Sequence, residues 1–247
     1  MIKLAKHKGK AEIFYTIQGE GKNMGKPSIF VRTSLCNLHC VWCDTDYTWN
    51  WENTPFKTVT NKKFKREEYI IEQSAEKIAK IISDFPCKHV VLTGGEPLMH
   101  DEELVALIDM LQKQSKNQYS FEIETNGTLI PSEALDKNID QYNVSPKLAN
   151  SHNSKKIREK PRALAFFSHN PKAYFKFVIS EAEDLDEVVR LVEKYHIKPE
   201  HIYLMPEGTN RATLSKKRQW LIEICKNYGY HYTDRLHVEV YGAKRGV

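Results

Sequence analysis

The chain has 247 residues, of which 40% are hydrophobic and 28% are charged, a composition typical of globular proteins. Its 37 basic residues outnumber its 32 acidic residues only slightly, which does not indicate a nucleic-acid-binding protein. No apolar run is long enough to cross a bilayer, and the basic N-terminal segment lacks the apolar stretch of a signal peptide. We therefore expect a cytoplasmic protein that binds neither membranes nor nucleic acid.

Short β-branched segments alternate with amphipathic segments along the chain, which indicates βα units. In chain order the pattern predicts strands at residues 28–33, 89–93, 119–125, 141–145, 174–180, 201–205 and 236–241, and helices at 66–82, from 101, at 131–137, at 184–195 and at 211–228. About six such units are fewer than the eight of a closed barrel. We expect an α/β fold with mostly parallel strands, arranged as an open partial barrel of the (β/α)6 type.

Unusual residues follow the ends of these predicted strands. They fall at 36–43, 94–97, 124–127, 145–147 and 206–207. In βα architectures the reacting groups gather at the C-terminal ends of the strands. The sequence therefore predicts that these segments share one pocket.

Three of the five cysteines lie within eight residues, in the segment CNLHCVWC. The spacing of Cys36, Cys40 and Cys43 allows three thiolates to hold one face of a 4Fe–4S cluster and leaves one iron without a protein ligand. The alternative is a structural zinc site with a histidine as fourth ligand, although no second cysteine pair exists to complete it. Cys87 and Cys225 stand alone beside apolar residues, and we expect both to be core residues.

The segment TGGEP, residues 93–97, ends the second predicted strand. Paired glycines let the backbone approach a ligand closely, and Glu96 offers a carboxylate to an ammonium group. The alternative is an ordinary strand-to-helix turn, in which paired glycines are also common.

Together, CNLHCVWC and TGGEP resemble the radical S-adenosylmethionine superfamily. The resemblance implies one domain over residues 1–247, a 4Fe–4S cluster on the three cysteines, and S-adenosylmethionine bound to the fourth iron. It also implies an electron donor such as flavodoxin or ferredoxin. The cofactor-binding residues implied are Trp42, Cys43, Asp44, Gly95, Glu96, Glu124, Asn126, Ser145, Pro146 and Lys147.

Further segments resemble the 7-carboxy-7-deazaguanine synthase family from about residue 13 to the C-terminus: YTIQGEG, CDT, ETNG, VSPK and the terminal GAKRGV. The resemblance implies conversion of 6-carboxy-5,6,7,8-tetrahydropterin to 7-carboxy-7-deazaguanine with loss of ammonia, for queuosine and related 7-deazapurines. It implies that a 5′-deoxyadenosyl radical takes the C6 hydrogen before the ring contracts. It also implies Mg²⁺ and a homodimer.

The predicted substrate-binding residues are Ile17, Gln18, Gly19, Glu20, Arg32, Thr93, His237 and Val247. Gln18 and Glu20 match the donors and acceptors of a pterin edge, unless they are surface turn residues. Arg32 can hold a carboxylate through paired hydrogen bonds. By resemblance Thr45 is a Mg²⁺ ligand, although it could instead cap a turn. The terminal segment is predicted to close over the substrate, whereas an ordinary chain end frays.

Two alternative functions use the same motifs. One is a radical activase that abstracts hydrogen from a glycine of a partner protein, although TIQGEG and the short C-terminus favour a small substrate. The other is a non-catalytic zinc-binding module. A long loop at about 47–65, which holds Trp49 and Trp51, interrupts the resemblance. It could be a lid, a dimer contact or a docking surface for the electron donor.

Overall fold

The computed structural model describes residues 1–247, which form one 11-stranded sheet with helices around it. The strands are β1 (Ile2–His7), β2 (Lys10–Ala11), β3 (Ile13–Ile17), β4 (Pro27–Thr33), β5 (Ile70–Gln73), β6 (His89–Gly94), β7 (Ser120–Thr125), β8 (Gln141–Val144), β9 (Ala173–Ile179), β10 (Ile202–Pro206) and β11 (His231–Tyr232). The helices are α1 (Arg66–Tyr69), α2 (Ala75–Ser83), α3 (Asp101–Ser115), α4 (Glu133–Asp136), α5 (Lys155–Arg158), α6 (Pro161–His169), α7 (Asp184–Tyr195), α8 (Arg211–Tyr228) and α9 (Leu236–Tyr241).

The main body of the sheet is parallel. Strands β4, β6, β7, β8, β9, β10 and β11 follow one another in space and pair in parallel register. The sheet is curved but does not close, because β11 and the antiparallel pair β1–β2 form its two ends. The predicted open α/β barrel with mostly parallel strands is confirmed.

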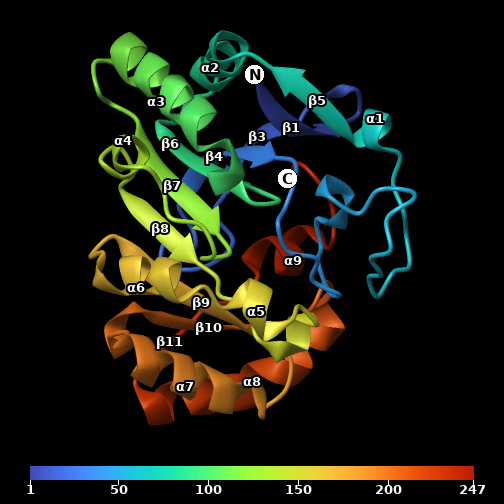
Figure 1. The fold of residues 1–247 in the computed structure, drawn as a ribbon, viewed down its shortest axis with the longest axis vertical. Coiled ribbons are helices and arrows are strands. Elements are labelled where there is room, and N and C mark those ends of the chain that lie inside the picture. The colour runs from blue at the N-terminus through green and yellow to red at the C-terminus, as the bar shows by residue number, and fades with distance from the viewer.

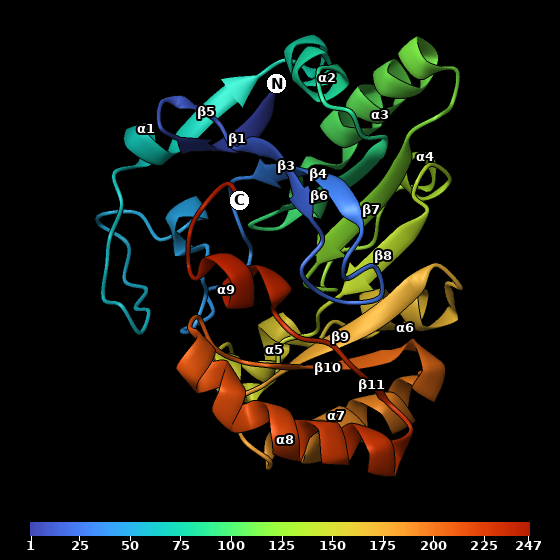
Figure 2. The same cartoon turned by 180° about the vertical axis from the view of Figure 1, so that it is seen from behind.

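Helices cover the outer face of this curved sheet. In Figures 1 and 2, α2, α3, α6, α7 and α8 lie along its outside, whereas α9 and the C-terminus lie on its inner side. Helix α3 shows why the outer helices form there: its apolar residues recur at helical spacing, and all four point into the core. Those four are Leu104, Leu107, Ile108 and Leu111. The inner face is left for polar side chains.

No helix of the protein is both long and apolar enough to span a bilayer.

The predicted helix at 66–82 is wrong at residues 70–73, which form a strand. Only α1 and α2 are helical there, and β5 lies between them and pairs antiparallel with β1. The Ser74 hydroxyl accepts a hydrogen bond from the Lys77 amide and so begins α2. Because the partner strand β1 is far away in sequence, the periodicity of 66–82 could not reveal this pairing.

The predicted strand at 236–241 is also wrong, since this segment is helix α9. It has no strand beside it to pair with, and its backbone closes locally, with the Gly242 amide donating to the Val238 carbonyl. A six-residue alternation of apolar and polar residues is too short to exclude a helix. The strands β1, β2, β3, β5 and β11 and the helices α5 and α6 were not predicted.

Candidate active site

The loop that carries the three cysteines, residues 34–45, begins where β4 ends. Leu35 has a left-handed backbone, with φ of 77°, which turns the chain just before Cys36. Backbone hydrogen bonds join this turn to the end of β6: Gly95 N donates to Thr33 O at 3.1 Å, and Glu96 N donates to Leu35 O at 2.8 Å.

The glycines of TGGEP make that junction possible. A Cβ atom on Gly95 would lie 1.9 Å from Leu35 O, and one on Gly94 would lie 2.1 Å from Thr33 O. Both distances are far inside van der Waals contact, so neither position tolerates a side chain. The glycine pair therefore lets the end of β6 pack directly against the backbone at the start of the cysteine loop. The sequence had predicted a close approach to a ligand and not this backbone contact.

Each cysteine sulfur accepts a hydrogen bond from a nitrogen donor of the protein. Leu38 N donates to Cys36 Sγ at 3.5 Å, and Asn153 Nδ2 donates to Cys40 Sγ at 3.3 Å. Trp49 Nε1 donates to Cys43 Sγ at 3.4 Å. Such N–H···S contacts stabilise thiolates and tune the potential of iron–sulfur clusters.

Burial raises the pKa of all three thiols, that of Cys43 to about 12. These thiols therefore need a strong positive charge in order to ionise, and bound iron would supply it. Cys40 is buried, Cys36 and Cys43 are half-buried, and three such sulfurs with aligned donors fit an iron–sulfur cluster.

No group of three or more His, Cys, Asp or Glu side chains converges closely enough to hold a single metal ion. A structural zinc needs its sulfur ligands about 2.3 Å from one centre, whereas a cluster separates the thiolates that cap its corners. Cys225 belongs to the hydrophobic core and Cys87 packs against it, so both are core residues as predicted.

One pocket joins the cysteine loop to the ends of β3, β4 and the parallel strands from β6 to β10, and to the C-terminal segment. All the predicted site residues line this pocket except Glu96 and Pro146. The Glu96 carboxylate is fully buried and accepts hydrogen bonds from Leu98 N, Thr125 Oγ1 and Asn126 N, at 3.1, 2.8 and 2.7 Å. It connects the ends of β6 and β7, and its contact with a cofactor stays a prediction.

Gln18 begins the turn between β3 and β4 and points into the pocket. Its side chain is buried, and its Nε2 donates to carboxylate oxygens of Glu122 and Glu124, the latter at 3.2 Å. Glu124 also accepts from Asn143 Nδ2 at 2.7 Å. Gln18 is therefore no surface turn residue, and the two glutamates of β7 hold its amide in one orientation.

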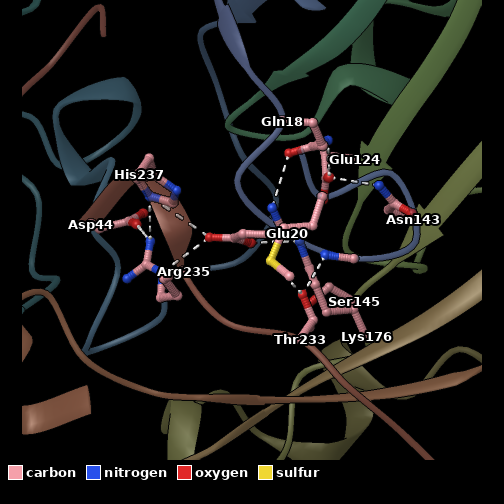
Figure 3. Close-up of polar contacts among 12 residues, drawn as sticks. Gln18, Glu20, Asp44, Glu124, Asn143, Ser145, Lys176, Thr233, Arg235 and His237 are labelled. Atoms are coloured by element: carbon pink, nitrogen blue, oxygen red, sulfur yellow. Dashed lines mark hydrogen bonds and ion pairs between the residues drawn. The ribbon is translucent and has the colours of Figure 1, made fainter. Parts of the chain in front are cut away.

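Glu20 lies between two cations, as Figure 3 shows. Its carboxylate oxygens are 2.6 Å from Lys176 Nζ and 3.0 Å from Arg235 Nε. Lys176 is also 2.7 Å from Glu124. Burial opposes ionisation of Glu20, but Lys176 and Arg235 outweigh it and hold its pKa below the ordinary value. Glu20 is therefore a half-buried carboxylate that the two cations hold in its charged form.

The C-terminal segment completes this side of the pocket. Arg235 reaches Asp44 of the cysteine loop as well as Glu20, and Leu236 N donates to Gly19 O at 2.9 Å. A Cβ atom on Gly19 would lie 2.4 Å from Nδ1 of His237, so a larger residue there would displace the His237 ring. Helix α9 thereby connects the β3–β4 turn to the cysteine loop.

The end of the tail is anchored rather than frayed. Arg245 forms an ion pair with Glu12 at 2.5 Å, and its guanidinium lies 3.5 Å from the centre of the Tyr47 ring. Val247 lines the pocket beyond this anchor.

Arg32 carries a hydrogen-bond donor without a partner. Its Nε is buried and lies 3.4 Å from Glu12 Oε1, but no acceptor is aligned with its hydrogen. It stands on β4 opposite Thr93 of β6, and both residues line the pocket. Buried donors are almost always satisfied, so an open one facing a pocket indicates a place for a ligand.

Lys176, Arg235 and Glu122 were missed by the sequence analysis. Lys176 is the only charged residue of β9, and a lone charge in an apolar strand was the available signal. Glu122 alternates with Glu124 along β7 and so faces the same side of the sheet. Nothing in the sequence around Arg235 distinguishes it from a surface residue.

Comparison with known proteins assigns the family. The family model described as the radical SAM superfamily matches residues 30–166. The 7-carboxy-7-deazaguanine synthase of Pyrobaculum aerophilum is 35% identical to this chain over 95% of each protein. The chain belongs to the 7-carboxy-7-deazaguanine synthase family. The enzyme of that name from Halobacterium salinarum is 34% identical over 93% of this chain and 89% of its own length.

The fold agrees with this family. The crystal structure of QueE from Escherichia coli superposes with a TM-score of 0.66 at 29% identity, over 92% of each chain. As a member of the 7-carboxy-7-deazaguanine synthase family, the chain is a radical S-adenosylmethionine lyase of 7-deazapurine biosynthesis that acts on a small molecule. The family implies a 4Fe–4S cluster and S-adenosylmethionine. Neither the glycyl-radical activase nor the zinc module agrees with this membership.

Proposed function

We propose that the pocket binds 6-carboxy-5,6,7,8-tetrahydropterin with its ring edge against Gln18 and Glu20 and its carboxylate at Arg32. The observation that carries the proposal is the arrangement of these three groups. A charged carboxylate, an oriented amide and an unpartnered guanidinium N–H line the same pocket as the three cysteines. A pterin edge offers amine and ring N–H groups to the Glu20 carboxylate and to Oε1 of Gln18, whose two Nε2 hydrogens are donated to Glu122 and Glu124.

In this proposal the cysteines hold the cluster, and the residues from Trp42 to Lys147 predicted above surround S-adenosylmethionine. When bound, the two cofactors supply a 5′-deoxyadenosyl radical that abstracts hydrogen from C6 of the substrate. The protein's own part is placement. Gln18 and Glu20 orient the ring, Arg32 holds the carboxylate near C6, and the C-terminal segment excludes water while the ring contracts and ammonia leaves.

We also propose a Mg²⁺ ion at the Thr45 hydroxyl, held otherwise by the substrate carboxylate and water. Thr45 lines the pocket beside Cys43, with 3.6 Å between Oγ1 and Sγ. Because Mg²⁺ keeps several waters, one protein ligand with a substrate oxygen is sufficient. Omission of Mg²⁺ should raise KM for the carboxypterin, and this increase should vanish in Thr45→Ala.

The remaining parts of the proposal concern the whole molecule. Residues 1–247 act as one domain, because a single sheet runs from end to end of the chain. The enzyme works as a homodimer in the cytoplasm and receives electrons from a carrier such as flavodoxin or ferredoxin. Analytical ultracentrifugation tests the dimer directly.

The decisive experiment is an anaerobic assay of reconstituted protein with the carboxypterin deuterated at C6. We expect 7-carboxy-7-deazaguanine and ammonia as products, with the deuterium recovered in 5′-deoxyadenosine by mass spectrometry. Cleavage of S-adenosylmethionine on an intact cluster without any deazaguanine would reject the substrate. Product formed without deuterium in 5′-deoxyadenosine would reject hydrogen abstraction at C6.

A further inference from the structure

The outer side of the cysteine loop is held between two segments. Val41 N donates to Ser151 O at 3.1 Å, and Val41 O accepts from Val59 N at 2.8 Å. Figure 1 shows the loop of residues 50–65 and helix α5 on either side of the chain that follows β4. Tyr47 and Trp49, at the start of the predicted 47–65 loop, line the pocket, whereas residues 50–65 do not.

Both segments contact the residues that surround the cysteine sulfurs. From the loop of residues 50–65, the Phe56 ring stacks on the His39 ring with 3.5 Å between their centres. From the segment before α5, Asn153 accepts from His39 N at 2.9 Å and donates to Cys40 Sγ at 3.3 Å. The surface of these two segments is therefore separated from the cluster site by one layer of side chains.

Positive charge is concentrated in the same two segments. Residues 50–65 hold four lysines and one glutamate, and residues 149–162 hold five lysines and arginines and one glutamate. Together the two segments carry more positive charge than the whole chain, whose net charge is +5. Lys57, Lys62 and Lys156 are exposed, and none of their ammonium groups forms an ion pair within the protein.

Exposed apolar side chains stand among these lysines. The accessible fraction is 70% for Val59 and 38% for Ile157. A small apolar centre with a charged rim is typical of transient electron-transfer complexes, which bury little surface and depend on electrostatic steering.

We propose that this outer cluster surface, made of Lys57, Val59, Lys62, Lys155, Lys156 and Ile157, is the docking site of an acidic one-electron carrier protein. The inference rests on the proposed function, which requires such a carrier. One electron leaves the reduced carrier and enters the oxidised cluster, so the carrier is oxidised and the cluster reduced by one. No covalent bond changes, and no proton is transferred. The opposite side of the cluster site remains free for the substrate.

The charge of this surface argues against two other occupants. A two-fold dimer through it would place the same lysines of two copies opposite each other, and like charges across an interface repel. A nucleic acid would be attracted, but the basic area is confined to the two segments, whereas nucleic-acid binding uses a longer basic stripe.

The test is the triple variant Lys57→Glu, Lys62→Glu and Lys156→Glu. Its matched control is the triple variant Lys113→Glu, Lys137→Glu and Lys216→Glu, which makes the same charge change at exposed positions on or beside α3, α4 and α8. Both proteins are prepared with their cluster and compared with the unmodified enzyme. The measurements are Kd for an acidic flavodoxin by calorimetry, the rate of cluster reduction by reduced flavodoxin, and turnover with dithionite as the reductant.

We expect the docking variant to lose about 10- to 100-fold in flavodoxin affinity and in the rate of cluster reduction, as charge reversal removes steering. Its turnover with dithionite should stay within about twofold of the unmodified enzyme, and the control should lose little in any measurement. Equal losses in variant and control would overturn the proposal. A loss of dithionite turnover or a changed oligomeric state in the docking variant would also overturn it. So would unchanged flavodoxin kinetics in that variant together with lost binding of an RNA oligonucleotide. Failure of the dithionite reaction in all three proteins would instead reject the proposed function.

Discussion

The cysteine end and the ion-pair end of the pocket differ in where their residues come from. At the cysteine end, the three sulfurs lie within eight residues, and burial raises the pKa of their thiols. At the other end, Glu20, Lys176 and Arg235 come from the β3–β4 turn, from β9 and from the chain just before α9. Lys176 and Arg235 are already paired with Glu20, Glu124 and Asp44. The cysteine end therefore depends on a cofactor for its charge balance, whereas the ion-pair end depends on the fold.

Removal of a cluster ligand is the most severe test of this difference. Cys40→Ala should abolish turnover and lower the iron and sulfide content, because two thiolates cannot hold the cluster in place. The folded structure should remain, since no protein ion pair is lost. Metal analysis and the anaerobic assay measure the effect, with Cys87→Ala as the control that keeps both cluster and activity. Full turnover in Cys40→Ala would contradict our assignment of the cluster ligands.

At the ion-pair end, loss of the central cation should reduce stability instead. Lys176→Met leaves the half-buried carboxylates of Glu20 and Glu124 without their shared partner, which should lower the free energy of unfolding by about 3 kcal/mol. Urea denaturation of the metal-free protein measures this loss. The control Lys226→Met removes an exposed pair with Glu223 and should change stability little. Equal stability of the two variants would show that Lys176 is not needed to balance these charges.

Loss of the charge of Glu20 should affect substrate binding. Glu20→Gln keeps the shape of the side chain but removes a charged acceptor, and should raise KM for the carboxypterin about 10- to 100-fold. S-adenosylmethionine binding should stay within about twofold. Steady-state kinetics and calorimetry separate the two effects, and Glu223→Gln on the exposed face of α8 is the control. An unchanged KM would remove Glu20 from the substrate site.

The ion-pair end should also respond to pH. Lys176 and Arg235 hold the pKa of Glu20 below its ordinary value of 4.5, despite burial. A lowered pKa stabilises the fold fully above pH 4.5, and this stabilisation is lost as the pH falls from there toward the pKa of the folded state. The stability difference between the unmodified protein and Glu20→Gln should therefore shrink below pH 4.5. Urea denaturation between pH 7 and pH 3 measures it, and a constant difference would mean that Glu20 is not ionised in the fold.

The smallest expected effect concerns the hydrogen bonds at the cysteine end. Trp49→Phe keeps an aromatic ring but removes the donor to Cys43 Sγ. Reduction adds negative charge to the cluster, so loss of a donor should lower its potential, by about 20–60 mV. A redox titration followed by electron paramagnetic resonance measures the shift. Trp51→Phe, in the same loop, should leave the potential unchanged.

The contrast between local and long-range contacts also explains which helices and strands could be predicted from the sequence. Helices α7 and α8 match the predicted residues because their apolar spacing is local and complete within each helix. Strands β1 and β5 were missed because they stabilise each other across about 65 residues of chain. Helix α9 was predicted as a strand, because an alternation over six residues does not show whether a sheet edge is available.

For the site, the sequence by itself determined the chemistry of the cofactor. Three thiols at a short spacing and two glycines at the end of a strand act through their immediate neighbours in the chain. Their local sequence pattern was therefore sufficient to predict the cluster and its cofactor. Only the tertiary structure decided the opposite wall. Lys176 and Arg235 became partners of Glu20 because parallel strands and the returning C-terminus bring their charges into one buried space. In a buried space of low dielectric constant, ions must be paired, and which ions meet depends on the complete fold.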